Sequence, residues 1–422
     1  MGSASSRVAE GSDLIAQSGR RRQRRAWRLP ATTTRGAAFH KDKPASGLCY
    51  RTVKADMANP AILFPASTGE LKNTEAIVRA KSFPQLRYMG SKHRLLPWVG
   101  EALSGLSFQS ALDAFSGSGS VAYLLKSMGK RVVANDFLNF PYQIGMATIE
   151  NSRIRLNDAQ CAMLLESNRK RQQFIQKTFT GIFFSPDDLR FLDNTWANLP
   201  MLPSSMHRSL ALAALVRSCI KRQPRGVFTV AGDPEHYKDG RRDETLSLKQ
   251  HFLESVAAYN AVVFDNGCKN TAVKGDVFEA DTEVDLVYMD PPYVPRADDN
   301  CYVKRYHFLE GLASYWKDPG TEIVERSRVK KIPKRFTPFS YRRTAADAFD
   351  RMLARFREST LVLSYSSNGY PDLPVITEIM RRYKRTVDVQ ERDHRYHFGT
   401  HDKVASERAA VQEYLIIGQG TR

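Results

Sequence analysis

The residues Asp290-Pro291-Pro292-Tyr293 form the segment of this 422-residue sequence best suited to chemistry. They follow the mostly apolar run 284–289, which is typical of a buried strand. Two successive prolines cannot extend a strand ladder, so they make a stiff loop at the edge where open α/β sheets bind ligands. The Asp290 carboxylate and the Pro291 carbonyl can accept two N–H bonds, and the Tyr293 ring can stack on a flat heterocycle. The loop therefore predicts a site for an amino group on an aromatic base; the alternative is a proline-rich turn with an exposed aspartate.

A second candidate is the turn Ser116-Gly117-Ser118-Gly119-Ser120, which follows the short apolar run 111–115. Gly117 and Gly119 let the backbone approach a ligand without an intervening Cβ. The turn opens a predicted helix over 121–128, whose first N–H groups favour an anion. It lacks the third glycine of the dinucleotide fingerprint and the Lys-Ser/Thr of a phosphate loop. Alone, it is equally consistent with a structural strand-to-helix turn.

Asp136 ends the next predicted strand, 131–136, about 20 residues after the glycine turn, where an acidic side chain can accept hydrogen bonds from ribose hydroxyls. Taken alone, Asp136 would be interpreted as a helix cap or a turn residue. Its spacing from the glycine turn indicates an adenosine-containing ligand.

A sheet is needed to bring these segments together. Strand 111–115, the turn, helix 121–128 and strand 131–136 form a βαβ unit, which predicts parallel strands with a right-handed crossover. Helical patterns dominate from about residue 150 to 265, and strand patterns return near 284–290, 360–365 and 414–417. The predicted fold is α/β: a Rossmann-like, doubly wound mixed sheet with an inserted, mostly helical domain.

The composition fits a polyanionic partner, because the net charge is +18 and Lys and Arg neutralise phosphates. No window holds the roughly 18 uninterrupted apolar residues of a membrane span. The five cysteines are dispersed, with no C-x-x-C pair, which argues against structural zinc or a disulfide framework. We expect a protein of the reducing cytoplasm with no bound metal.

The first 56 residues differ from the rest of the chain. They contain the run Arg20-Arg21-Arg22-Gln23-Arg24-Arg25 and carry roughly +8 of the net charge. Three interpretations remain open: a DNA-binding arm, a transit-like peptide, and a translated leader upstream of a biological start at Met57. We expect poor order in this extension and place its end at residue 80.

The motifs and their order resemble the Dam-like DNA adenine-specific N6-methyltransferases, a class I S-adenosylmethionine-dependent family. Arg87-Tyr88-Met89-Gly90-Ser91-Lys92 comes first, then the glycine turn, the helical insertion and the Asp-Pro-Pro-Tyr loop. The first motif departs from the aromatic-Ala-Gly-Gly-Lys form that is common in the family. The resemblance implies four segments, which are the extension 1–80, a first catalytic part 81–150, a target-recognition insertion 151–268 and a second catalytic part 269–422.

The resemblance also implies residue roles. The loop residues Asp290, Pro291, Pro292 and Tyr293 would hold a flipped adenine of double-stranded DNA. S-adenosylmethionine would contact Tyr88, Lys92, Asp113, Phe115, Gly117, Gly119, Asp136, Asp276 and Asp290. Within that set Lys92 suits the methionine carboxylate, Asp136 the ribose and Asp276 the adenine. Segment 302–315 would be a helix that shapes the target pocket, with His307 packed rather than acting as a base. Segment 363–368 would be a later strand and loop near that pocket.

Two basic stretches predict contacts with DNA, and their residues are Lys221, Arg222 and Arg225, and Lys331, Lys334 and Arg335. For the first stretch a solvated charged loop between helices is the alternative. We expect a monomer in the cytoplasm of a bacterium, associated with the nucleoid. Two roles remain open: a restriction–modification system with a cognate restriction endonuclease as a partner, and an orphan or phage-derived enzyme.

Two other functions remain open. An RNA adenine methyltransferase would share the fold and the loop, whereas Asp at the head of the loop disfavours a cytosine or a protein amide. A non-catalytic DNA-binding protein on the same scaffold is the third hypothesis. The intact Gly117, Gly119, Asp290 and Tyr293 argue against it.

Overall fold

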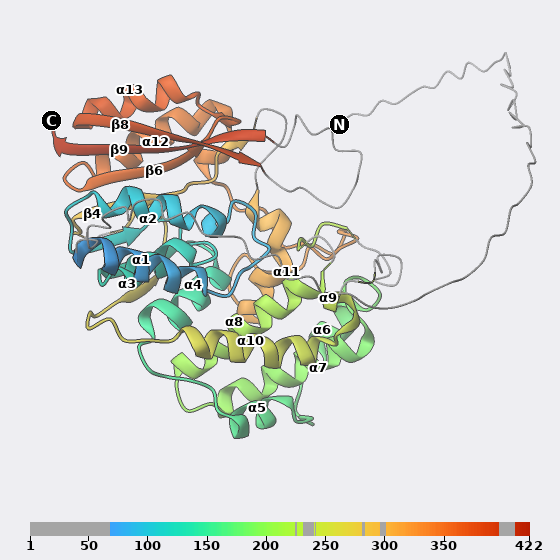
Figure 1. Ribbon diagram of the computed structural model, residues 1–422. Helices are drawn as coiled ribbons and strands as arrows, with labels where there is room; N and C mark the ends of the chain where they lie inside the picture. The colour runs from blue at the N-terminus through green and yellow to red at the C-terminus, as the bar shows by residue number, and fades with distance from the viewer. Residues whose placement is uncertain are drawn as a thin grey trace, which may run out of the picture. The chain divides into compact units, whose positions relative to one another are not determined.

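The computed structural model describes residues 68–223, 226–230, 240, 242–280, 283–295, 301–395 and 410–422, all within one compact unit. Their central feature is a seven-stranded sheet in the order β3-β2-β1-β4-β6-β9-β8 (Figure 1). Neighbouring strands from β3 to β6 are parallel, and β9 runs antiparallel to both β6 and β8. The predicted doubly wound mixed sheet is therefore confirmed. The strands are β1 (Ser110–Asp113), β2 (Arg131–Asp136), β3 (Thr271–Lys274), β4 (Leu286–Met289), β6 (Thr360–Ser366), β8 (Lys384–Arg395) and β9 (Ala410–Thr421).

The centre of the sheet positions the site. Strands β1 and β4 lie side by side and are buried at every residue, as expected for parallel strands covered on both faces. The chain runs outward through β2 and β3 on one side and through β6 on the other, so the topological switch point lies between β1 and β4. Ligands bind at the carboxyl ends of strands at such a point, which here are Asp113 and Asp290.

The two faces of the sheet carry separate hydrophobic clusters because side chains alternate along each strand. Val132 and Tyr288 point into one cluster, and Val133 and Val287 into the other. The first face packs on α1 (Thr68–Lys81), α2 (Leu96–Ser104) and α3 (Ser120–Ser127), and the second on α12 (Arg342–Arg355) and α13 (Leu373–Tyr383).

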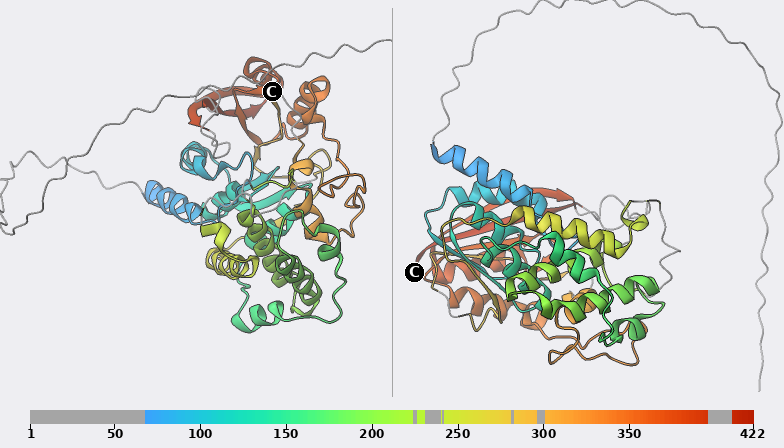
Figure 2. Two further views of the ribbon diagram at one scale, coloured as in Figure 1. Left: turned by 90° about the vertical axis from the view of Figure 1, so that its right-hand side faces the viewer. Right: turned by 90° about the horizontal axis from the view of Figure 1, so that it is seen from below.

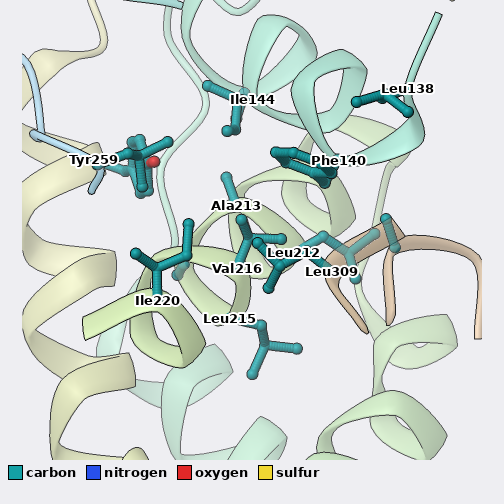
Figure 3. Packing of buried hydrophobic residues seen from close by; sticks show 14 of the residues in the cluster. Leu138, Phe140, Ile144, Leu212, Ala213, Leu215, Val216, Ile220, Tyr259 and Leu309 are labelled. Carbon is teal, nitrogen blue, oxygen red and sulfur yellow. The ribbon is translucent and has the colours of Figure 1, made fainter. Parts of the chain in front are cut away.

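The insertion is built around α8 (Ser205–Arg222), whose residues 209–216 are all buried, as expected for a helix surrounded by others. Figure 3 shows Ala213 and Val216 of α8 close to Phe140 of α4 (Asn139–Gly145), with Leu309 of α11 (Tyr302–Ser314) beside them. The insertion therefore shares one continuous core with the catalytic part. Its other helices are α5 (Asp158–Leu165), α6 (Phe174–Phe179), α7 (Pro186–Asn198), α9 (Arg242–Thr245) and α10 (Leu248–Val262).

Figures 1 and 2 show the insertion helices gathered at one end of the sheet and β8 and β9 at the other. The carboxyl edge of the sheet is thus flanked by the insertion helices at one end and by β8 and β9 at the other. The role of the insertion in target recognition stays a prediction.

The predicted extension to residue 80 is wrong for its last part. Thr68–Lys81 form a helix in which Ala76 and Ala80 are buried. Its Ile77 side chain occupies the space that Gly100 of α2 leaves open, where a Cβ would lie only 2.8 Å away. The helix is held by this packing rather than by a strong apolar stripe of its own. The Arg-rich run lies outside the described residues.

Candidate active site

The Asp-Pro-Pro-Tyr loop leaves the buried strand β4 and is fixed by a small two-stranded ribbon. Its continuation β5 (Val294–Pro295) pairs antiparallel with β7 (Gly369–Tyr370), which follows β6. The Tyr293 ring meets the Tyr365 ring edge-on, with centroids 5.3 Å apart. A Cβ at Gly369 would lie 3.1 Å from the Tyr293 ring, so glycine permits this close approach. The loop is therefore held by backbone pairing as well as by its prolines.

Asp290 at the head of this loop forms a largely buried ion pair with Lys92. The Lys92 Nζ donates to Asp290 Oδ1 at 2.9 Å and to the Gly90 carbonyl at 3.2 Å. Burial raises the pKa of Asp290, and the Lys92 charge opposes that rise. The ammonium that was predicted to face a cofactor carboxylate is thus directed at the predicted catalytic carboxylate.

The glycine turn and Asp136 form one hydrogen-bonded unit. Gly117 N–H donates to Asp136 Oδ2 and Leu138 N–H donates to Oδ1, each at 2.9 Å. Gly117 has a positive φ, and a Cβ there would lie 3.0 Å from the Tyr88 ring. Burial raises the pKa of Asp136 to about 6, and the backbone N–H donors oppose the rise. The carboxylate therefore shapes the turn while it also lines the pocket.

Asp113, at the end of β1, is a buried carboxyl group with an unused acceptor. Only 1% of the residue is exposed, and its Oδ1 has no hydrogen-bond partner among the described residues. Burial and the neighbouring charge of Asp290 raise its pKa to about 8. A cationic group entering beside it would relieve this cost, because an unpaired buried polar atom is unfavourable.

Helix α11 holds the first motif, residues 87–92, in place through hydrogen bonds and ring stacking. The Tyr306 hydroxyl accepts a hydrogen bond from Met89 N–H at 2.7 Å, and the Tyr302 hydroxyl donates to the Met89 carbonyl at 3.3 Å. The Tyr88 ring stacks on Tyr306 with centroids 4.9 Å apart. A Cβ at Gly90 would lie 3.0 Å from the Tyr302 hydroxyl. The resemblance assigned the segment 302–315 to the target pocket, but it did not predict these contacts.

Most of the predicted cofactor residues line one pocket at the carboxyl edge of the sheet. A second hollow shares Phe115, Phe137 and Pro292 with it and adds Asp276. Gly119 is the N-cap of α3 and does not line either space. The predicted residues that line the first pocket are Tyr88, Lys92, Asp113, Phe115, Gly117, Asp136, Asp290 and Pro292.

A large part of the sequence matches known methyltransferases. The profile of the D12 class N6 adenine-specific DNA methyltransferases matches residues 88–323, more than half of the chain. The chain belongs to this family. The family's substrate is adenine in DNA, so this chain is a DNA adenine methyltransferase.

Curated relatives of this methyltransferase have similar names. Type II methyltransferase M2.HphI of Haemophilus parahaemolyticus is 29% identical over 329 residues, which cover 74% of this chain and 92% of the relative. Type II methyltransferase M.NlaIII of Neisseria lactamica is 24% identical over 363 residues, covering 80% of this chain and all of the relative. Modification methylase LlaI of Lactococcus lactis subsp. lactis is 22% identical over 356 residues, covering 78% of this chain and 54% of the relative.

Two buried polar residues of α11 support the methyltransferase pocket without facing it. His307 Nε2 lies 2.7 Å from the Phe228 carbonyl, and burial lowers the pKa of His307 to about 4. Glu310 accepts hydrogen bonds from the backbone N–H and the side-chain amide of Asn139, at 2.7 and 3.0 Å. These contacts agree with a packed His307 and tie α11 to the start of α4.

The basic residues predicted to contact DNA are partly paired with acidic groups of the same chain. Lys221 lies 3.4 Å from both Asp243 and Glu254, and Arg222 lies 3.5 Å from Asp188. The predicted loop is wrong for these two residues, because they form the last turn of α8, where cations favour the helix dipole.

The second basic stretch, residues 331–335, is also partly paired with an acidic group of the same chain. Arg335 pairs with the buried Glu310 at 3.2 Å, Lys331 is half-buried and Lys334 is exposed. Arg225 lies outside the described residues. Direct DNA contacts by these residues stay a prediction. In the part of the chain that the structure describes, no helix has the length and apolar character needed to cross a membrane.

Proposed function

We propose that this protein is a site-specific enzyme that transfers a methyl group from S-adenosylmethionine to the N6 amino group of adenine in double-stranded DNA. The observation that carries the proposal is the placement of Asp290. It lies at the carboxyl end of a central strand, beside Lys92 and at the edge of a pocket lined by the glycine turn.

The residues present fit S-adenosylmethionine. The unpartnered Oδ1 of Asp113 suits the cationic methionine end, and Gly117 leaves space that a Cβ would fill. Asp136 keeps acceptor capacity for ribose hydroxyls, since a carboxylate can accept more hydrogen bonds than the backbone N–H groups of Gly117 and Leu138 supply. The apolar hollow with Asp276 suits an adenine ring.

S-adenosylmethionine, when bound, supplies an electrophilic methyl group on a positively charged sulfur. The exocyclic nitrogen of adenine is a poor nucleophile because its lone pair is delocalised into the ring. Asp290 and the Pro291 carbonyl accept its two N–H bonds and stabilise the positive charge that develops on it. Lys92 favours the ionised form of Asp290, which is the form that accepts both a proton and a hydrogen bond.

The target base must leave the helix stack to reach this loop. Tyr293 replaces the lost stacking with its ring, and the Tyr365 contact holds that ring in place. We assign recognition of the DNA sequence to the helical insertion 151–268, which packs on α11 through one shared core. The names of the type II relatives support a restriction–modification role with a cognate endonuclease, and a DNA substrate supports a cytoplasmic location.

The test is transfer of labelled methyl groups from S-adenosylmethionine to unmethylated duplex DNA, with RNA of the same sequence in parallel. We expect label in DNA as N6-methyladenine and none in RNA. Asp290→Asn keeps the size of the side chain and removes the charge, so it should lose most activity. Its thermal melting should also fall, because Lys92 loses its buried counter-charge, so the assay is run below the melting temperature of the variant. Label in RNA alone would replace this function with the RNA alternative.

A further inference from the structure

Phe336 is the most exposed large hydrophobic side chain among the residues that the structure describes, at 69%. It lies between α11 and α12, beyond the span that the family profile matches. A single exposed aromatic side chain is common on protein surfaces, so its exposure alone does not identify a partner. The position of Phe336 relative to the second hollow indicates that partner.

The second hollow has a rigid aromatic floor. Phe278 and Phe339 stack in parallel with centroids 5.4 Å apart, and Phe339 meets Phe115 edge-on at 5.6 Å. The Arg351 guanidinium lies 4.4 Å from the centroid of Phe278. In this floor Phe339 is buried and the other two rings are half-buried, whereas Phe336, which lines the same hollow, is exposed.

A buried polar atom in the hollow also lacks a partner. Asn135 is 2% exposed, and its amide nitrogen donates to the Ala114 carbonyl at 3.0 Å. Its Oδ1 has no hydrogen-bond partner within the described part of the chain, and the residue lines the hollow. A flat apolar ligand with an N–H donor, as in adenine, would satisfy this acceptor and cover the aromatic floor.

Phe336 is held at the rim by its neighbours. The Tyr341 ring lies nearly parallel to the Phe336 ring, with centroids 5.3 Å apart, and is itself 44% exposed. The Tyr341 carbonyl accepts from Thr344 and Ala345 N–H in the first turn of α12. The stacked pair is therefore attached to a helix end rather than to a free loop.

We propose that Phe336, backed by Tyr341, packs on the adenine ring of bound S-adenosylmethionine and closes the outer side of the hollow, with Asn135 Oδ1 as an acceptor for the adenine amino group. The inference rests on the proposed function. It makes Phe336 and Asn135 cofactor-binding residues in addition to those that the sequence motifs predict.

A DNA contact is the competing role for the same surface, because Lys334 and Arg343 are exposed nearby in the sequence. The cofactor is favoured since Phe336 shares the hollow with Asp276 and with the unpartnered Asn135 oxygen. The two roles predict opposite patterns in binding measurements.

Titration calorimetry of the full chain with S-adenosylmethionine and with S-adenosylhomocysteine tests the inference. Loss of one aromatic face should raise the Kd of Phe336→Ala for both ligands about 10-fold, whereas Phe336→Tyr should stay near the wild type. Met201→Ala, which removes a side chain of similar exposure from the insertion, should change neither Kd. The KM for S-adenosylmethionine should rise in Phe336→Ala in parallel with the Kd.

DNA binding of the same variants is measured by fluorescence anisotropy with S-adenosylhomocysteine at saturation. An unchanged ligand Kd in Phe336→Ala would overturn the inference, and a raised DNA Kd in that variant would assign the surface to DNA instead. If the wild type binds neither ligand, the proposed function fails with it. If the wild type binds and Phe336→Ala binds equally well, only the inference fails.

Discussion

Replacement of Lys92 by Met should move the activity of this methyltransferase to higher pH. The Lys92 ammonium lies 2.9 Å from Asp290 Oδ1, and Lys92 is 4% exposed. Two unit charges at that distance attract by about 6 kcal/mol at an effective dielectric constant of about 20. Removing one partner of a buried pair typically leaves about 3–5 kcal/mol uncompensated.

The sign of the effect follows from the causes of the Asp290 pKa. Burial raises that pKa and Lys92 lowers it, so Lys92→Met removes the opposing charge and the pKa rises further. Because about one-fifth of the Asp290 side chain remains exposed, we take the lower end of the 3–5 kcal/mol range, about 3 kcal/mol. At about 1.4 kcal/mol per pH unit, the acid limb of kcat should move up by about two pH units.

The assay is kcat against pH at saturating DNA and cofactor, so that a weaker cofactor affinity does not enter. Arg382→Met is the matched control, because it removes a cation from an exposed pair with Asp350 on the far helices. It should leave the profile unchanged. A Lys92→Met profile that superimposes on that of the wild type would refute the idea that Lys92 sets the protonation of Asp290.

Three further changes test the supports of the site. Tyr306→Phe leaves the Met89 N–H without its acceptor, which should cost about 1–3 kcal/mol of unfolding free energy and raise the KM for cofactor. Gly311→Ala places a Cβ 2.2 Å from the Trp316 ring, so urea unfolding should show a loss of at least about 2 kcal/mol. In the folded protein the pKa of His307 is lowered to about 4, so its contribution to the free energy of unfolding is complete above about pH 6.5 and is lost as the pH falls toward 4. His307→Gln should therefore flatten the dependence of the unfolding free energy on pH between these two values.

Each of these three predictions has an outcome that would contradict it. An unchanged KM for cofactor in Tyr306→Phe would contradict the idea that α11 positions the first motif for cofactor binding. Gly105→Ala is the control for Gly311→Ala, because Gly105 has an ordinary φ and a Cβ there would make only an ordinary contact, 3.7 Å from the Ala102 carbonyl oxygen. Equal stability of the two variants would contradict the packing argument. A pH slope as steep in His307→Gln as in the wild type would assign the titration to another group.

The local parts of the site could be predicted from the sequence. Strand β4 and the loop after it carry their own signals, since apolar runs and paired prolines act over a few residues. The glycine turn was predictable for the same reason, and its helix begins at Ser120, one residue before the predicted start. Strand β8 was not predicted, because it is an edge strand of mainly polar residues without an apolar alternation.

Contacts between distant segments could not be predicted from patterns. Lys92 and Asp290 are 198 residues apart, and only the order of the strands brings them together. The pairing of Lys221 with Asp243 and Glu254 also depends on how α8, α9 and α10 pack. The number of basic residues in a run is therefore larger than the number of cations available to bind phosphates, because some of them pair with acidic groups of the same chain.

The most direct test of the account is the identity of the methylated atom. Unmethylated genomic duplex DNA is incubated with labelled S-adenosylmethionine and the full chain, digested to nucleosides and separated by mass. We expect label in N6-methyldeoxyadenosine with the wild type and a loss of at least about 100-fold with Asp290→Asn. Label in methylated deoxycytidine, or equal labelling by Asp290→Asn, would contradict it.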